Sequence, residues 1–65
     1  MANELQIQIG ATYILDGDIF ELVEIQGPYF ILMPLKVNNT YHTSDDGSIV
    51  MKAIHFSKAK RYIGM

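Results

Sequence analysis

Closely spaced turn signals constrain the fold of this chain more than any other feature. They fall at Asp16-Gly17, at Gly27-Pro28, at Asn38-Asn39 and at residues 44–47. Asp-Gly readily takes the positive φ angles of a two-residue hairpin loop, and proline interrupts a strand because it has no backbone N–H. Turn signals about every ten residues, with no sustained helical period of apolar residues between them, predict short strands and an all-β chain.

The segments between the turns have the alternation and composition of strands. The expected full strands are residues 5–9, 11–15, Asp18–Gln26, 29–37 and 48–56, with shorter ones at 40–43 and 61–63. Gly10 is expected to form a bend or bulge, and Pro34 should lie at a sheet edge or a bulge because it cannot donate to a ladder. Ser57 is expected to cap one short helical turn over residues 57–60. These elements predict a small five- or six-stranded barrel with a helical turn near the C-terminus.

Length and composition indicate one small domain. The chain has 65 residues, of which 49% are hydrophobic, and a barrel is expected over residues 5–65 after a leader at 1–4. The absence of cysteine excludes a disulfide framework, a zinc ribbon and thiol catalysis. We see no signal-peptide pattern and no apolar run long enough to span a membrane, so a cytoplasmic location is expected. A core this small would gain from dimerisation or from docking onto a partner.

One stretch resembles a known architecture. Residues 10–13 (Gly-Ala-Thr-Tyr) and 17–23 (Gly-Asp-Ile-Phe-Glu-Leu-Val) are similar to the opening hairpin of SH3-like (KOW-type) barrels. The helical turn before residues 61–63 also looks like the turn before the closing strand of that architecture. The resemblance implies an SH3-like barrel over residues 10–63. The tryptophan, the long first loop and the acidic proline-peptide site of signalling SH3 domains are missing, so proline-peptide binding is not implied.

The chain lacks a recognisable set of catalytic or metal-binding residues. His42 and His55 are the two histidines, which are too few and too far apart for a metal site. The acidic turn at residues 44–47 lacks the spacing of a calcium loop. Glu21 and Glu24 are expected on opposite faces of their strand, which would separate a general acid from a general base. We therefore expect no enzyme activity, no cofactor and no metal.

The strand expected at residues 29–37 is a candidate protein interface because it has apolar residues on both faces. One face can fill the barrel, and the other needs a cover from other strands, from a second copy or from a partner. The candidate interface residues are Tyr29, Phe30, Leu32, Met33 and Leu35. Tyrosine, phenylalanine and methionine are enriched at interface centres, which favours this interpretation.

Charge is distributed unevenly along the chain. Residues 1–50 contain all seven acidic side chains and one lysine, whereas residues 51–65 contain the other four basic side chains and no acid. The candidate nucleic-acid-binding residues are Lys52, Lys58, Lys60, Arg61 and Tyr62. Cations can contact phosphates and an aromatic face can stack on a base. The acidic remainder of the chain would repel phosphates, and the basic segment can instead pair with the acidic strands.

These observations favour a non-enzymatic module that binds another protein or a second copy of itself. By analogy of size and fold, we expect a small regulatory, adaptor or inhibitor protein of the kind that phages and mobile elements encode. A nucleic-acid-binding SH3-like barrel that uses the basic C-terminal segment is the alternative. A third hypothesis is a structural subunit that self-assembles through residues 29–35.

Overall fold

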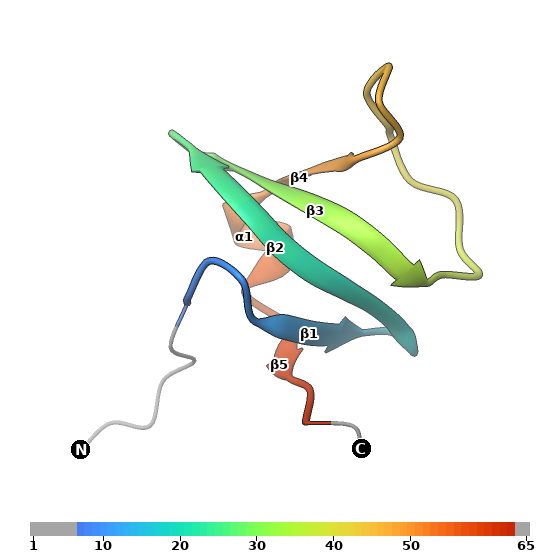
Figure 1. Ribbon diagram of the computed structural model, residues 1–65. Helices are drawn as coiled ribbons and strands as arrows, with labels where there is room; N and C mark the ends of the chain where they lie inside the picture. Colours follow the sequence, from blue (N-terminus) through green and yellow to red (C-terminus); the bar gives the residue numbers. More distant parts are fainter. Residues whose placement is uncertain (1–6, 64–65) are drawn as a thin grey trace.

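The computed structural model describes residues 7–63, which form one antiparallel five-stranded sheet and one short helix (Figure 1). The elements are β1 (Thr12–Leu15), β2 (Asp18–Gln26), β3 (Tyr29–Lys36), β4 (Ile49–Lys52), α1 (Ala53–Phe56) and β5 (Lys60–Arg61). The strand order is β4-β3-β2-β1-β5, and the edge strands β4 and β5 do not pair, so the sheet is open. The predicted all-β class with one short helix is confirmed. No helix in residues 7–63 is long and apolar enough to cross a membrane.

The first two turns form as the sequence predicts. Leu15 pairs with Asp18, and the two residues between them, Asp16 and Gly17, have φ angles of 51° and 85°. Positive φ at both central positions is the pattern of a type I′ turn, whose twist matches that of the strands it joins. The β2–β3 hairpin also has a two-residue loop, but only its first residue, Gly27, has a positive φ, at 57°, because the ring of Pro28 fixes a negative φ. These two hairpins determine the order β1-β2-β3.

Two register shifts interrupt the pairing of β2 with β3. Phe20 pairs with Pro34 and Ile19 pairs with Lys36, so Leu35 is an extra residue beside the proline. The predicted irregularity at Pro34 is therefore confirmed.

The second shift changes which side chains share a face. It lies between Leu22 and Glu24 and leaves Val23 as the extra residue on β2. Such an extra residue reverses the inward–outward alternation of the strand beyond it. Glu21 pairs with Met33 and Glu24 pairs with Ile31, two β3 residues on one side of the sheet. The expectation that the glutamates lie on opposite faces is therefore wrong.

The region after β4 differs from the prediction. The expected strand at 48–56 ends at Lys52, and the helical turn expected at 57–60 occurs instead as α1 at Ala53–Phe56. Ser57 ends this helix rather than starting it, and its hydroxyl donates to the Ile54 carbonyl at 2.7 Å. The physical reason is the burial of Phe56, since the helical turn aims its ring at the core.

Three short elements differ from the prediction. Residues 5 and 6 lie outside the described range, and residues 7–9 form a loop rather than a strand, with Gly10 in a turn at φ 94°. The expected strand at 40–43 reduces to an isolated bridge between Thr43 and Ile49. The last strand covers Lys60–Arg61 rather than residues 61–63. The leader expected at 1–4 lies outside the described residues.

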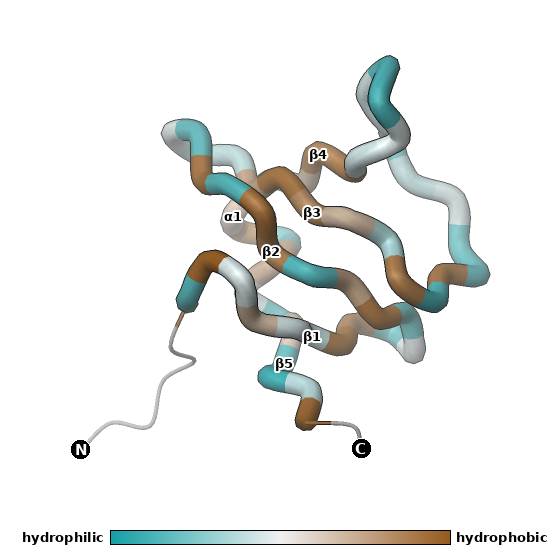
Figure 2. The backbone as a smooth tube through the Cα atoms, viewed as in Figure 1, coloured by the Kyte–Doolittle hydropathy of each residue, from teal (hydrophilic) through white to brown (hydrophobic). Residues whose placement is uncertain are grey.

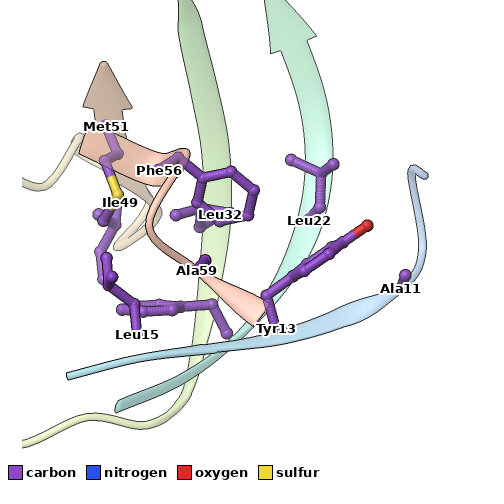
Figure 3. Packing of buried hydrophobic residues seen from close by; sticks show 10 residues of the cluster. Ala11, Tyr13, Leu15, Leu22, Leu32, Ile49, Met51, Phe56 and Ala59 are labelled. Carbon is purple, nitrogen blue, oxygen red and sulfur yellow. The ribbon is translucent and has the colours of Figure 1, made fainter. Parts of the chain in front are cut away.

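The core lies between the sheet and α1 (Figure 3). The Phe56 ring makes edge-to-face contacts with Tyr13 at 5.1 Å and with Phe30 at 4.8 Å between ring centroids. The other buried hydrophobic residues are Ala11, Leu15, Phe20, Leu22, Leu32, Ile49, Met51 and Ala59. Every strand except β5 contributes to this cluster. The Phe56 ring of α1 contacts both β1 and β3 and thereby connects these two strands.

The β1–β2 turn gives a direct test of the fold. A valine at Gly17 would meet no atom within 4 Å of its Cβ, so the cost of Gly17→Val arises from the positive φ alone. We expect a loss of about 1–3 kcal/mol in the free energy of unfolding, measured by urea denaturation. The control Asp16→Asn keeps a residue that tolerates positive φ and should change stability by no more than about 0.5 kcal/mol. Equal stability of Gly17→Val and the wild type would contradict this turn geometry.

Candidate protein-interaction surface

The sheet has an inner face that packs against α1 and an opposite face, here called the outer face. Figure 1 shows α1 on one side of the sheet, behind β2 and β3 in this view. In β1, Tyr13 and Leu15 are buried on the inner side, whereas Ile14 between them is half-buried on the outer side. The same alternation in β2 and β4 defines the outer face of those strands.

Strand register assigns the side chains of the outer face, because residues directly opposite each other in an antiparallel pair share a face. One row across the strands holds Lys60, Ile14, Ile19 and Lys36. The second row holds Thr12, Glu21 and Met33. The third row holds Glu24, Ile31 and Val50, and the fourth row holds Gln26, Tyr29 and Lys52. A hydrogen bond of 3.1 Å from the Gln26 amide to the Glu24 carboxylate confirms that these two side chains lie together.

The outer face is more apolar than the solvent side of an ordinary antiparallel sheet. Such a sheet usually alternates apolar residues inward with polar residues outward. Here the outward positions of the central strands include Ile14, Ile19, Ile31, Met33 and Val50. Figure 2 shows hydrophobic residues along β2, β3 and β4, whereas the β3–β4 loop is mainly pale or hydrophilic. The helix α1 lies on the other side of the sheet and does not cover this face (Figure 1).

The structure divides the five residues that the sequence suggests as a protein interface. Tyr29 and Met33 lie on the outer face and are 41% and 40% exposed, and Leu35 at the bulge is 54% exposed. Phe30 and Leu32 point inward, where Leu32 is fully buried and Phe30 packs on Phe56. Phe30 and Leu32 therefore belong to the core, and the accessible part of the predicted interface is the other three residues.

Four apolar outer-face residues were not identified from the sequence. They are Ile14, Ile19, Ile31 and Val50, which are half-buried. The alternation around each of them is visible in the sequence. However, alternation alone does not tell which of the two faces the core occupies.

The basic C-terminal residues do not form one surface. Lys60 lies on the outer face opposite Ile14, whereas Arg61 lies on the other side and stacks over the Tyr13 ring at 5.9 Å. Lys58 is exposed in the turn after α1, and Tyr62 donates its backbone N–H to Thr12 at 2.9 Å. Lys52 is on β4, the edge strand opposite to β5.

Asp18, at the start of β2, is a buried carboxylate that is 1% exposed. Its oxygens accept hydrogen bonds from the Asn38 backbone N–H at 2.8 Å, from the Asn39 amide at 2.7 Å and from the Tyr41 hydroxyl at 2.7 Å. A further bond comes from the Asn39 backbone N–H at 3.4 Å. All four donors belong to the β3–β4 loop, so the carboxylate fastens that loop to the start of β2.

The hydrogen bonds around Asp18 alter the protonation of both partners. The bond from the Asn38 N–H, followed by that from Tyr41, lowers the pKa of Asp18 from 3.8 to about 2. Desolvation, followed by the bond to Asp18, raises the pKa of Tyr41 from 10.0 to about 12. Asp18 is thus held ionised and Tyr41 protonated at neutral pH. A carboxylate whose acceptor sites are occupied by its own chain acts as a structural anchor.

The acidic turn at residues 44–47 is also structural. The Ser48 backbone N–H and hydroxyl both donate to Asp46, at 3.0 Å and 2.7 Å, and the hydroxyl bond is the main cause of the lowered pKa of Asp46. Gly47 donates back to the Ser44 carbonyl at 3.0 Å, as in a β-turn. Among the described residues, no group of three or more histidine, aspartate or glutamate side chains could hold a metal ion.

Acid should weaken the fold through Asp18. Because the folded-state pKa of about 2 lies below the ordinary 3.8, the stabilisation is complete above pH 3.8 and is lost as the pH falls toward 2. The Asp18→Asn variant should therefore melt below the wild type at neutral pH, and the gap should narrow between pH 3.8 and 2. Asp46 titrates in both proteins, so thermal melts of the pair isolate Asp18. A gap that stays constant with pH would contradict this role.

The outer face and the Asp18 carboxylate thus differ in their access to other molecules. The outer face combines an apolar centre with charged side chains of both signs, whereas Asp18 is enclosed by its own loop. Of the two, only the outer face is open to another molecule.

No protein-family model matches the chain, and neither does any curated protein or solved structure.

Proposed function

We propose that this protein is a non-enzymatic module that binds a protein partner through the outer face of its sheet. The observation that carries the proposal is the row-by-row placement of Ile14, Ile19, Ile31, Met33 and Val50 on a face that α1 does not cover. Apolar side chains with tyrosine and methionine among them are typical of the buried centre of an interface. The buried carboxylate of Asp18 is hydrogen-bonded by the β3–β4 loop and stabilises the fold, so we assign partner binding to the outer face.

The arrangement of elements supports an SH3-like barrel as the finer description of the fold. A tight β1–β2 hairpin, a meander through β4, a short helical segment and a last strand beside β1 follow the order expected for that architecture. SH3-like barrels host many unrelated functions, so the binding role rests on the outer face and not on the fold. A cytoplasmic regulatory, adaptor or inhibitor protein, of the kind phages encode, is the role we propose for it.

The outer face can be tested by a charge placed at its centre. Met33→Glu should leave the fold intact, because Met33 is 40% exposed and the like-charge pair that it makes with Glu21 across the strands should cost no more than about 1 kcal/mol. The variant should abolish recovery of partners when the tagged protein is purified from its native cells. The control Ile54→Glu adds the same charge on α1, at a residue that is 78% exposed and outside the outer face. Mass spectrometry identifies the co-purified proteins, and circular dichroism checks the fold. Equal recovery with both variants would contradict the proposal.

A nucleic-acid-binding function remains the second proposal, favoured by one observation. Lys58 and Lys60 are exposed, and neither forms an ion pair with another residue of the described range. The predicted pairing of the basic segment with the acidic strands therefore does not occupy these two charges within residues 7–63. Against this function, Glu21 and Glu24 share the outer face with Lys60 and would repel phosphates.

Salt dependence separates the two functions. If Lys58 and Lys60 contact phosphates, the affinity for DNA or RNA should fall steeply with salt, and the Lys58→Ala, Lys60→Ala variant should reduce the slope of log K against log salt by about 2. Fluorescence anisotropy with labelled single- and double-stranded oligonucleotides measures this. We expect no tight binding at physiological salt. Tight binding that is lost in the double variant, with the fold retained, would favour nucleic acid over protein as the partner.

A further inference from the structure

The outer face carries charges of both signs in addition to its apolar side chains. Glu21 and Glu24 lie on β2 near the middle of the sheet, and both glutamates face the same side because of the bulge at Val23. Three lysines share that face, namely Lys36 at the end of β3, Lys52 at the end of β4 and Lys60 on the edge strand β5. The sequence alone, read without the bulge, would separate the two acids.

We propose that the occupant of the outer face is a second copy of this chain, packed sheet against sheet in a symmetric dimer. This inference rests on the proposed function and names its partner. A symmetric interface places the same surface on both subunits, so the surface has to be complementary to itself. On this face Ile31 lies between Glu21 and Lys52, so a two-fold axis that passes through Ile31 and runs between those two positions sets Glu21 of one copy opposite Lys52 of the other.

The arrangement of these charges argues for a protein rather than a nucleic acid. A polyanion would meet Glu21 and Glu24 at the centre of the face, where like charges are repelled. A second copy would bring lysines toward those acids, and paired charges near an interface fix the relative orientation of the partners. The apolar residues between them, including Ile31 and Met33, would supply the buried centre.

The size of the chain gives an independent reason for a second copy. Within residues 7–63, ten hydrophobic residues make up the buried cluster on the inner face. Chains below about 70–80 residues seldom obtain a large stability margin from one core, and oligomerisation is a common remedy. Packing two outer faces would add a second apolar layer to each sheet, as in a sandwich.

The first test measures mass and surface dependence. Sedimentation equilibrium of the full chain should give twice the 7.4 kDa of one chain at micromolar to millimolar concentration. Met33→Glu should yield the monomer mass with an unchanged circular dichroism spectrum, whereas Ile54→Glu should remain dimeric. A monomeric wild type would overturn the dimer, and so would a dimer that persists in Met33→Glu.

The second test uses two variants with opposite charge on the outer face. The positive variant carries Glu21→Lys and Glu24→Lys, and the negative variant carries Lys36→Glu, Lys52→Glu and Lys60→Glu. Each alone should dissociate at least about tenfold more readily than the wild type, because like charges then face each other, while an equimolar mixture should form a heterodimer. The control Asp45→Lys changes the same kind of charge in the β3–β4 loop and should not affect the dimer. Absence of the heterodimer would overturn the charge pairing.

The outcomes distinguish failure of this inference from failure of the proposed function. A monomeric wild type that still captures a different protein, and loses it in Met33→Glu, would refute the second copy and retain the outer face as a protein-binding surface. A monomer with no partner sensitive to Met33→Glu would refute both. Binding of an oligonucleotide that is lost in the negative variant would assign the face to nucleic acid instead.

Discussion

The contact of Phe56 with Tyr13 and Phe30 is the interaction on which the rest of this structure depends. The two edge-to-face pairs connect α1 to β1 and β3, which lie on either side of β2 in the sheet. Aromatic pairs of this geometry add about 0.5–1.5 kcal/mol each beyond the burial of their area. Because Phe56 draws α1 onto the inner face, that face becomes the core and the opposite face is left without a cover.

Asp18 supplies a second constraint that complements the aromatic contact. Its carboxylate gathers four donors from the β3–β4 loop, and Tyr41 from the same loop packs edge-on against Phe20 at 5.4 Å. A loop with little regular structure is thereby fixed against the first residues of β2. Burial of an ionised group is tolerated here because hydrogen bonds replace its hydration. The polar network is thus part of the fold, and recognition falls to the outer face.

The bulge at Val23 links the sheet to the surface that we propose for binding. Without the extra residue, Glu24 would point to the core side of β2 and Ile25 to the outer side. With it, Glu24 pairs with Ile31 on the outer face and joins Glu21, which precedes the bulge and already faces that side. A single irregular residue therefore adds a second acid to a face that already carries Glu21.

The sequence by itself determined the two tight hairpins and the bounds of Asp18–Gln26, since both depend on local backbone preferences. Asp16-Gly17 and Gly27-Pro28 favour their turns wherever they occur, and the prediction of an irregularity at Pro34 followed from its missing N–H. Tertiary structure decided where α1 forms, which face is the core and which acids share a face. The helix at Ala53–Phe56 has no side-chain cap at its start, and the contacts of Phe56 with Tyr13 and Phe30 favour the helical turn that buries this ring. Likewise, Leu32 and Met33 are both apolar neighbours on one strand, and the position of α1 decides that the first is core and the second is surface. Such choices depend on contacts between residues distant in sequence, which no local pattern encodes.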